Sequence, residues 1–268
     1  MKTACNNRPC LWLRLSLAIL IASPTDGSHA QTHYQVGVGC TNILDTYLSQ
    51  EKFHGVGVSL LTTRERPTAV GAGGTDRRWG SLWQHQMHLS SAKDRAGNAS
   101  VMEAMYKLCY GRYLRIPIGD RIEIHAGALA SAGLGFIYDT LGGNNPVQAR
   151  LGIHVMPSAK GVCRFQMFRR AAALRYQLDL PLAGVVFSPN YGQSYYEMFS
   201  LGNYDHNIVP VTFASAPNFR QQIALLCRVH KSLTLSIGYL GDYQQQSVNN
   251  LKQHVYDHAF LVGVGRNL

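Results

Sequence analysis

The chain has 268 residues, of which 46% are hydrophobic and 15% are charged, and its formal net charge is +10. The charged fraction is low, since about a quarter of the residues in a soluble domain are charged. The apolar content excludes a disordered chain. A mean hydropathy of -0.09 argues against a polytopic helical membrane protein. A Gly- and Tyr-rich β protein of about one domain remains, either soluble or embedded in a membrane as a barrel.

The amino terminus has the layout of a secretory signal peptide. Lys2, Arg8 and Arg14 precede or interrupt an apolar run over residues 11–22, and a small-residue cleavage site ends at Ala30. The apolar run is too short to cross a bilayer as a helix. We therefore predict a signal peptide over residues 1–30 and a single mature domain over residues 31–268.

Cleavage at this site removes three basic residues and one acidic residue, which takes the net charge from +10 to +8. An exported basic protein rarely meets nucleic acid, so no nucleic-acid partner is predicted. The expected partner is outer-membrane lipid, including anionic headgroups. A basic surface without a specific partner is the alternative, and the sequence does not predict an oligomeric state.

Four cysteines remain in the mature chain: Cys40, Cys109, Cys163 and Cys227. Export permits disulfide bonds. However, Cys163 and Cys227 are in phase with apolar neighbours, where a thiol acts as a small hydrophobe, and we expect free thiols at these two positions. No pair has the spacing of a zinc site or a redox dithiol, so neither a metal nor another cofactor is predicted.

Apolar side chains occupy every second position in several segments, as strands between lipid and lumen require. In chain order, this alternation predicts strands at residues 79–89, 107–118, 122–138, 163–167, 174–182, 222–229, 233–243 and 256–264. The segment 122–138 is the clearest. Its seventeen residues exceed a typical globular strand and suit a tilted membrane-crossing strand. Pro157 cannot donate to a ladder hydrogen bond, so a break is expected there.

The connections add a second signal. Short turns are predicted at residues 119–120, 169–171 and 230–232, and longer loops at 139–147, 183–218 and 242–254. Short turns at one end and long loops at the other are typical of outer-membrane barrels, which close with an even number of strands. We predict an all-β fold, an antiparallel up-and-down transmembrane β-barrel of 10 to 12 strands in the bacterial outer membrane. The alternative is a soluble secreted β-sandwich or lipocalin-like binding protein.

Five polar side chains are expected to face the lumen: Arg121, Glu123, His125, Arg175 and Asp179. A narrow barrel fills its interior, and buried charges are tolerated when they are paired, so a packed polar core is the predicted role. A pore lining or a proton-transfer site is the alternative. The predicted function is structural, adhesive or small-solute transport, and the sequence leaves open whether the protein is an enzyme.

Two patterns nevertheless suggest catalysis. His88 and Ser90 form a His-x-Ser pair like that of outer-membrane phospholipases and lipid deacylases, in which the His takes the Ser proton during acyl transfer. His230 and Ser232 repeat the spacing at a predicted turn. Ser194 is a third candidate, although it lacks the context of a nucleophile elbow. A lipid-modifying esterase is therefore the second functional hypothesis. The adjacent Asp205 and His206 are expected to be solvated rather than to bind a metal.

Three stretches resemble a known family. They are Asp45 to Ser49 with Gly55; Phe187 to Phe199, which contains Tyr191, Gly192, Gln193, Ser194, Tyr195, Tyr196 and Glu197; and Asn249 to Leu251 with His258, Phe260 and Gly263. They resemble a domain-of-unknown-function family of exported, barrel-like proteins from Bacteroidetes, over essentially the whole mature chain. The resemblance implies an outer-membrane setting and supplies no catalytic residue. Loop packing is the expected role of the central motif.

Overall fold

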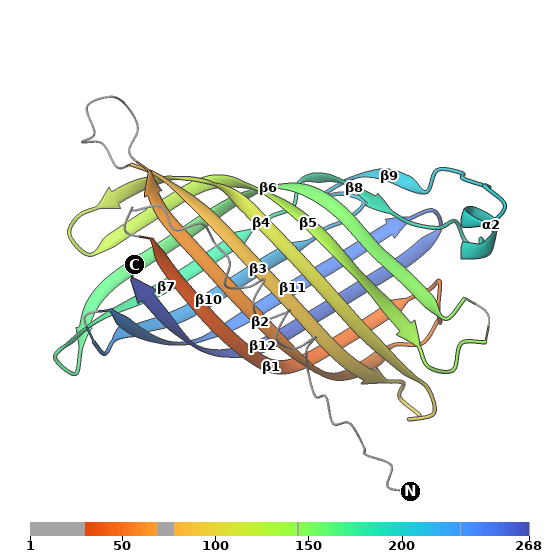
Figure 1. Cartoon of the computed structure of the whole chain (residues 1–268), viewed down its shortest axis with the longest axis horizontal. Helices are drawn as coiled ribbons and strands as arrows, with labels where there is room; N and C mark the ends of the chain where they lie inside the picture. The colour runs from red at the N-terminus through yellow and green to blue at the C-terminus, as the bar shows by residue number, and fades with distance from the viewer. Residues whose placement is uncertain (1–29, 69–77, 144, 231, 268) are drawn as a thin grey trace, which may run out of the picture.

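The computed structural model describes residues 30–68, 78–143, 145–230 and 232–267 (Figure 1). The predicted signal peptide lies outside the described residues, except for Ala30. The elements are β1 (Gln31–Asp45), β2 (Phe53–Thr68), β3 (Trp79–Lys93), β4 (Ser100–Ile118), β5 (Ile122–Asp139), β6 (Val147–Met167), β7 (Arg170–Asp179), β8 (Ala183–Phe187), α2 (Tyr195–Phe199), β9 (Ile208–Thr212), β10 (Phe219–Arg228), β11 (Leu233–Val248) and β12 (Leu251–Asn267). Within these residues, no helix is long and apolar enough to cross a membrane.

The strands form a closed antiparallel barrel. They pair in the order β5-β4-β3-β2-β1-β12-β11-β10-β7-β6, and pairing of β5 with β6 completes the ring. Two short extra strands lie beyond the ends of β7 and β10. β8 pairs with the first half of β6, whose second half pairs with β7, and β9 pairs with β8. The circumference therefore has ten strands, which confirms the predicted fold class and the even strand number.

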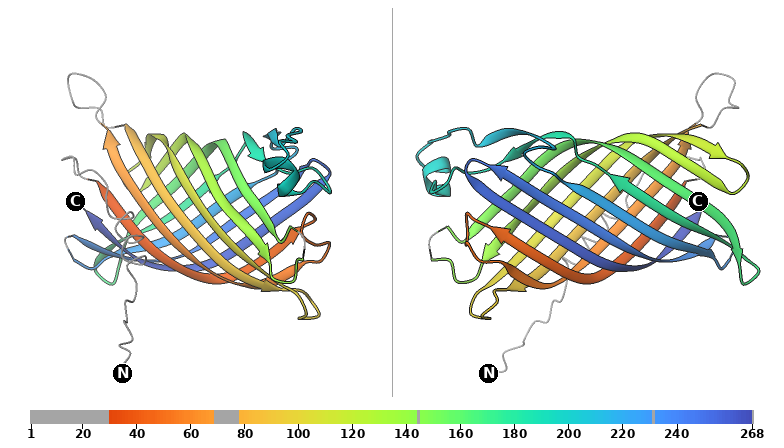
Figure 2. Two further views of the ribbon diagram at one scale, coloured as in Figure 1. Left: turned by 45° about the vertical axis from the view of Figure 1, so that its right-hand side comes forward. Right: turned by 180° about the vertical axis from the view of Figure 1, so that it is seen from behind.

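The two ends of the barrel differ (Figures 1 and 2). At the terminal end, Gln31 of β1 pairs with Asn267 of β12, and the short connections at residues 119–121, 168–169 and 229–232 lie here. At the opposite, loop end lie the connections at residues 46–52, 94–99, 140–146, 188–207 and 249–250. The predicted short turns are confirmed. In outer-membrane barrels the end with short turns faces the periplasm.

Side chains alternate between the outer wall and the lumen. In β5, Ile122, Leu134 and Phe136 are 45%, 62% and 45% exposed, whereas Glu123 and Ile137 are buried. In β3, Trp83, Met87 and Leu89 are exposed and Gln84, Gln86 and His88 are buried. The outer wall is thus apolar and most of the lumen is polar. A soluble β-sandwich or lipocalin has the opposite arrangement, so that alternative is wrong.

The predicted loop at residues 242–254 is wrong. β11 continues to Val248, and β12 begins at Leu251. Asn249 and Asn250 alone connect them, with φ angles of 53° and 61°. Positive φ at both central residues is the type I′ geometry that tight hairpins favour, and Asn tolerates it. The predicted loop at 183–218 likewise contains β8, α2 and β9.

We expect the Asn250→Val substitution to lower the free energy of unfolding by about 1–2 kcal/mol, because a β-branched residue is strained in the left-handed region. Asn250→Gly should change it by less than about 0.5 kcal/mol or stabilise the turn. Urea unfolding in phospholipid vesicles measures both values. Equal losses for Val and Gly would contradict a backbone origin.

The predicted break at Pro157 is also wrong, since β6 is continuous through this residue. In an antiparallel ladder, the N–H and C=O groups of one residue point toward the same neighbouring strand. The Pro157 carbonyl accepts a hydrogen bond from the Leu180 backbone N–H, with the donor and acceptor 3.1 Å apart. The missing N–H therefore faces the junction between β7 and β8, where the register shifts by one residue and Pro181 interrupts the ladder. A proline is tolerated at such a bulge.

The four cysteines are free thiols in the structure. Cys40 and Cys163 are exposed, Cys109 is buried and Cys227 is partly buried. The expectation of free thiols at Cys163 and Cys227 agrees with this arrangement.

Candidate binding vestibule and the filled lumen

A polar girdle crosses the middle of the lumen. Asp242 on β11 accepts hydrogen bonds from Lys107 Nζ on β4 at 2.6 Å and from Gln86 Nε2 on β3 at 3.0 Å. Arg220 on β10 donates to Asp179 of β7 at 3.0 Å and to Gln84 of β3 at 2.6 Å. These bonds join opposite walls of the barrel. The girdle therefore crosses the lumen with paired charges.

Apolar side chains fill the lumen near the loop end. The cluster consists of Ile43, Phe53, Ala92, Val101, Ile137 and Val255, with Leu48 and Ala99 packed against it. Six neighbouring strands of the ring, from β5 through β1 to β12, contribute one buried member each, so the cluster fills the lumen on that side of the barrel. This packing and the paired charges of the polar girdle favour a filled lumen over a continuous water-filled channel.

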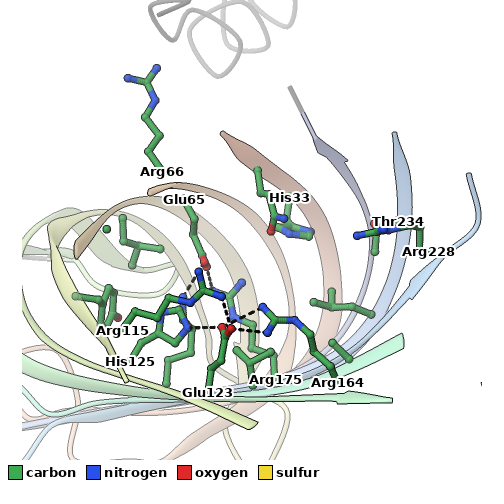
Figure 3. A pocket seen from close by; sticks show the side chains of 18 of the residues that line it. His33, Glu65, Arg66, Arg115, Glu123, His125, Arg164, Arg175, Arg228 and Thr234 are labelled. Carbon is green, nitrogen blue, oxygen red and sulfur yellow. Dashed lines mark hydrogen bonds and ion pairs between the residues drawn. The ribbon is translucent and has the colours of Figure 1, made fainter. Parts of the chain in front are cut away.

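A cavity of about 440 Å³ opens on the terminal side of the girdle (Figure 3). We call it the vestibule. Leu82 and Tyr113, both buried, line it and belong to an apolar cluster with Cys109, Leu129 and Met156. The vestibule therefore lies at the end that carries the short turns and has buried apolar side chains in its wall.

Glu123 forms the first charged cluster of the vestibule. Its carboxylate accepts from Arg115 of β4 and, at 2.5 and 3.0 Å, from Arg164 of β6 (Figure 3). His125 Nε2 lies 3.4 Å from the same carboxylate. The Arg115 and Arg164 side chains remain 42% and 50% exposed. Two guanidinium groups therefore share one carboxylate, leaving an excess positive charge that solvent can reach.

Glu65 forms the second cluster. Lys160 Nζ donates to Glu65 Oε2 at 2.7 Å, and Arg175 lies 2.5 Å from Glu65 Oε1. Arg66 and Arg228 also line the vestibule. Six cationic side chains and two carboxylates thus line the vestibule, and the low-dielectric wall strengthens the resulting positive potential.

His33 lines the same vestibule and is 7% exposed. Its Nδ1 atom is buried without a hydrogen-bond partner in the part of the chain that the structure describes. An unsatisfied buried polar atom is costly. Its position at the wall of a cationic cavity indicates a place where a ligand or ordered water completes the hydrogen bonding.

The structure separates the five predicted lumen residues. Glu123, His125 and Arg175 line the vestibule, and Asp179 belongs to the girdle. Arg121 instead lies in the turn before β5 and is exposed, so its predicted position in the lumen is wrong. The strand begins one residue later, and alternation does not constrain a residue in a turn.

His88 and Ser90 both face the lumen and are buried, but their side chains have different partners. His88 Nδ1 lies 2.8 Å from Ser59 Oγ, whereas Ser90 Oγ donates to Glu103 at 3.0 Å. Asp257 lies 3.3 Å from the other ring nitrogen of His88. Ser59, His88 and Asp257 have the residue types of a hydrolase triad, but Ser59 is 1% exposed and offers no surface to a lipid substrate.

Ser194 caps the short helix α2. Its side chain accepts from the Glu197 backbone N–H at 3.1 Å, and the Glu197 carboxylate accepts from the Ser194 N–H at 2.8 Å. This reciprocal arrangement is a capping box, which satisfies two backbone donors at the start of a helix. The Ser194 hydroxyl therefore has a structural partner.

The rest of the motif anchors its loop to the barrel. Tyr195 donates to Gln148 at 3.0 Å, and Tyr47 donates to the Gln193 carbonyl at 3.0 Å. Burial and the nearby carboxylates of Asp45 and Glu197 raise the pKa of Tyr47 to about 12, so its hydroxyl remains a donor at neutral pH. Within the motif, Tyr191 and Tyr196 are exposed, and Gly192 adopts a positive φ of 79°.

The remaining candidates are peripheral. His230 and Ser232 lie in the turn between β10 and β11, and both are exposed. His206 and Asp205 form an ion pair in the loop between α2 and β9. Their side chains are 88% and 66% exposed, which places them in solvent.

Sequence reasoning missed Glu65, Lys160 and His33 in the vestibule. Glu65 and Lys160 are separated by 95 residues and meet only because β2 and β6 lie across the lumen from each other. The inward parity of Lys160 on a strand is a usable signal, but its partner depends on barrel closure and register.

The apolar outer wall, the closed ladder and the polar, filled lumen define an outer-membrane β-barrel. The chain belongs to the family described as "Protein of unknown function (DUF3316)", whose model matches residues 16–268. This family membership agrees with the domain-of-unknown-function family that the sequence resembles. No curated protein matches the chain.

Solved structures with similar folds include two from Escherichia coli and one from Neisseria meningitidis. The outer membrane protease OmpT of E. coli is 6% identical, with a TM-score of 0.49, over 92% of this chain and 99% of that chain. The transport unit of the autotransporter AIDA-I of E. coli is 8% identical, with a TM-score of 0.46, over 96% and 97%. The translocator domain of autotransporter NalP from N. meningitidis is 13% identical, with a TM-score of 0.43, over 96% and 94%. We take no function from these likenesses.

Proposed function

We propose that this protein is a non-conducting outer-membrane barrel that binds an oxyanion-bearing ligand in the vestibule. The observation that carries this proposal is the pair of clusters in which Glu123 and Glu65 are each shared by two cations. Phosphate and sulfate groups match guanidinium donors in geometry and charge. The filled lumen beyond the vestibule supports binding rather than passage of a solute.

Two sources can supply such an oxyanion. One is a small phosphorylated or sulfated solute, and the other is an anionic lipid headgroup, the partner expected from the sequence. The vestibule accommodates either, because about 440 Å³ lies within the range of small-ligand pockets. The Bacteroidetes origin that the sequence resemblance implies stays a prediction.

We expect purified barrel in zwitterionic detergent to bind inorganic phosphate or sulfate, measured by isothermal titration calorimetry at low ionic strength. The double variant Arg115→Gln/Arg164→Gln should bind at least about tenfold more weakly, a loss of about 1.4 kcal/mol. Arg121→Gln, which removes an exposed charge outside the vestibule, is the matched control. Unchanged binding in the double variant would reject the vestibule as the site.

A parallel titration with short-chain phosphatidylglycerol distinguishes the two sources. Tighter binding than that of inorganic phosphate, lost in the double variant, would identify the headgroup. Heat-modifiable migration on gels verifies folding of each variant. In planar bilayers the protein should give no channel currents, whereas steady single-channel currents would contradict the filled lumen.

A further inference from the structure

Three ligand-type side chains meet in the lumen between the girdle and the apolar cluster of the loop end. They are His88 of β3, Glu103 of β4 and Asp257 of β12, with exposures of 4%, 2% and 5%. One donor atom from each lies within 4.8 Å of the other two. His88 Nε2 is 3.3 Å from Asp257 Oδ1 and 4.0 Å from Glu103 Oε2. Three separate strands thus direct one nitrogen and two carboxylates to a common point.

The charge balance at this point calls for a cation. Glu103 already pairs with Arg150, as Asp242 of the girdle pairs with Lys107. Asp257 receives a hydrogen bond from the Thr41 hydroxyl at 2.6 Å, and in the described part of the chain its ion pair is with His88. A buried carboxylate needs a positive partner, which either a proton on His88 Nε2 or a metal ion bound there supplies.

The hydrogen bond of the His88 imidazole orients its other ring nitrogen toward the two carboxylates. Ser59 Oγ lies 2.8 Å from Nδ1, and when Nδ1–H donates to this oxygen, the Nε2 lone pair faces the two carboxylates. Nε2 is buried and has no hydrogen-bond partner among the described residues. A lone pair that faces carboxylate oxygens is stable only when a proton or a metal cation lies between them. The hydrogen bond from Nδ1 is the orienting contact that metal-bound histidines commonly make.

Gly57 of β2 provides the space for the ring. A Cβ atom at this position would lie 2.6 Å from Cε1 and 2.8 Å from Nε2 of His88. Both distances are too short for contact without movement. Any side chain at residue 57 would therefore displace the ring nitrogen that faces the carboxylates.

We propose that His88, Glu103 and Asp257 bind a divalent transition-metal ion such as Zn²⁺. Bond lengths of about 2.0–2.2 Å place neighbouring donors of a tetrahedral zinc site about 3.3–3.6 Å apart. The pair of His88 and Asp257 already has this separation, and Glu103 needs to approach by about 0.6 Å. One imidazole and two carboxylates suit Zn²⁺ or Mn²⁺, whereas Ca²⁺ prefers six to eight oxygen ligands. The spacing of these residues in the sequence does not predict a metal site, because the three ligands come from three different strands.

The test uses the full mature chain without a histidine tag, folded in detergent, stripped with a chelator and titrated with Zn²⁺. We expect one equivalent of zinc after dialysis, measured by inductively coupled plasma mass spectrometry. His88→Ala should retain less than about a tenth of that amount. His85→Ala is the matched control, because His85 lies on the same strand but faces the outer wall, where it contacts the Tyr106 hydroxyl.

Two further variants separate ligation from folding. Asp257→Asn keeps the side-chain shape and should weaken zinc binding at least about tenfold, since a neutral amide is a poorer ligand. Gly57→Ala keeps all three ligand residues but displaces the His88 ring, and it should weaken zinc binding similarly. A wild-type chain that retains no zinc above the level of His88→Ala would overturn the proposal. So would full zinc retention in folded His88→Ala, with folding verified by heat-modifiable gel migration.

Discussion

Replacement of Asp242 by Ala is expected to lower the free energy of unfolding by about 3–5 kcal/mol, the range found when one partner of a buried ion pair is removed. Asp242 is 2% exposed and lies 2.6 Å from Lys107 Nζ. Without the carboxylate, the Lys107 ammonium group and the Gln86 amide lose their acceptor in the centre of the lumen. Urea unfolding in phospholipid vesicles, followed by tryptophan fluorescence, measures the change.

The double variant Lys107→Met/Asp242→Leu should recover most of this loss, because two apolar side chains leave no buried charge without a partner. Asp205→Ala removes an ion pair with His206 that is exposed, and it should cost less than about 0.5 kcal/mol. A loss in the double variant equal to that of Asp242→Ala would show that the ion pair is not the origin of the effect.

Alternation was the informative property of the sequence. In 122–138 and in 174–182 the residues of one parity are apolar, and the structure places Ile124 and Tyr176 on the outer wall with Glu123 and Arg175 inside. This succeeds because a strand turns successive side chains to opposite faces, and a lipid-facing wall tolerates few exceptions. Strand identity and facing follow from local sequence in these segments for this reason, whereas β1 and β2 lie in none of the predicted segments.

The extent of the strands was less predictable. Gln244, Gln245 and Gln246 suggest a loop by composition, yet they continue β11 as far as Val248. The strands extend beyond the apolar band, and there the outer positions no longer need to be apolar. The predicted strand break at Pro157 is wrong for a different reason. The N–H group that Pro157 lacks would face the irregular junction between β7 and β8, where no ladder hydrogen bond is lost.

The side-chain clusters inside the barrel could not be predicted without the strand pairing of the closed barrel. Ser59 lies beside His88 because β2 and β3 pair in one register, in which residue 59 is opposite residue 88. Asp257 reaches the same imidazole from β12, beyond β1 in the ring. A shift of one residue in any of these pairings would turn a ligand to the outer wall. The sequence alone contains the residue types of such a cluster but not their distances.

The outer wall leads to the second large expected effect. Val155 is 59% exposed and pairs with Ala130, near the middle of β5, so it lies near the mid-height of the barrel. Val155→Arg should lower the free energy of unfolding in lipid by about 2–4 kcal/mol, because an arginine at the bilayer midplane is poorly solvated.

Ile122→Arg provides the matched control. Ile122 is 45% exposed but stands at the first position of β5, at the terminal end of the barrel. Arginine there reaches the headgroups, and the expected loss is at most about 1 kcal/mol. Both values come from urea unfolding in vesicles of one lipid composition. The difference between the two losses of unfolding free energy is the decisive result. A wall exposed to water would give similar, small losses at both positions. A wall in contact with hydrocarbon destabilises the charged variant only at mid-height.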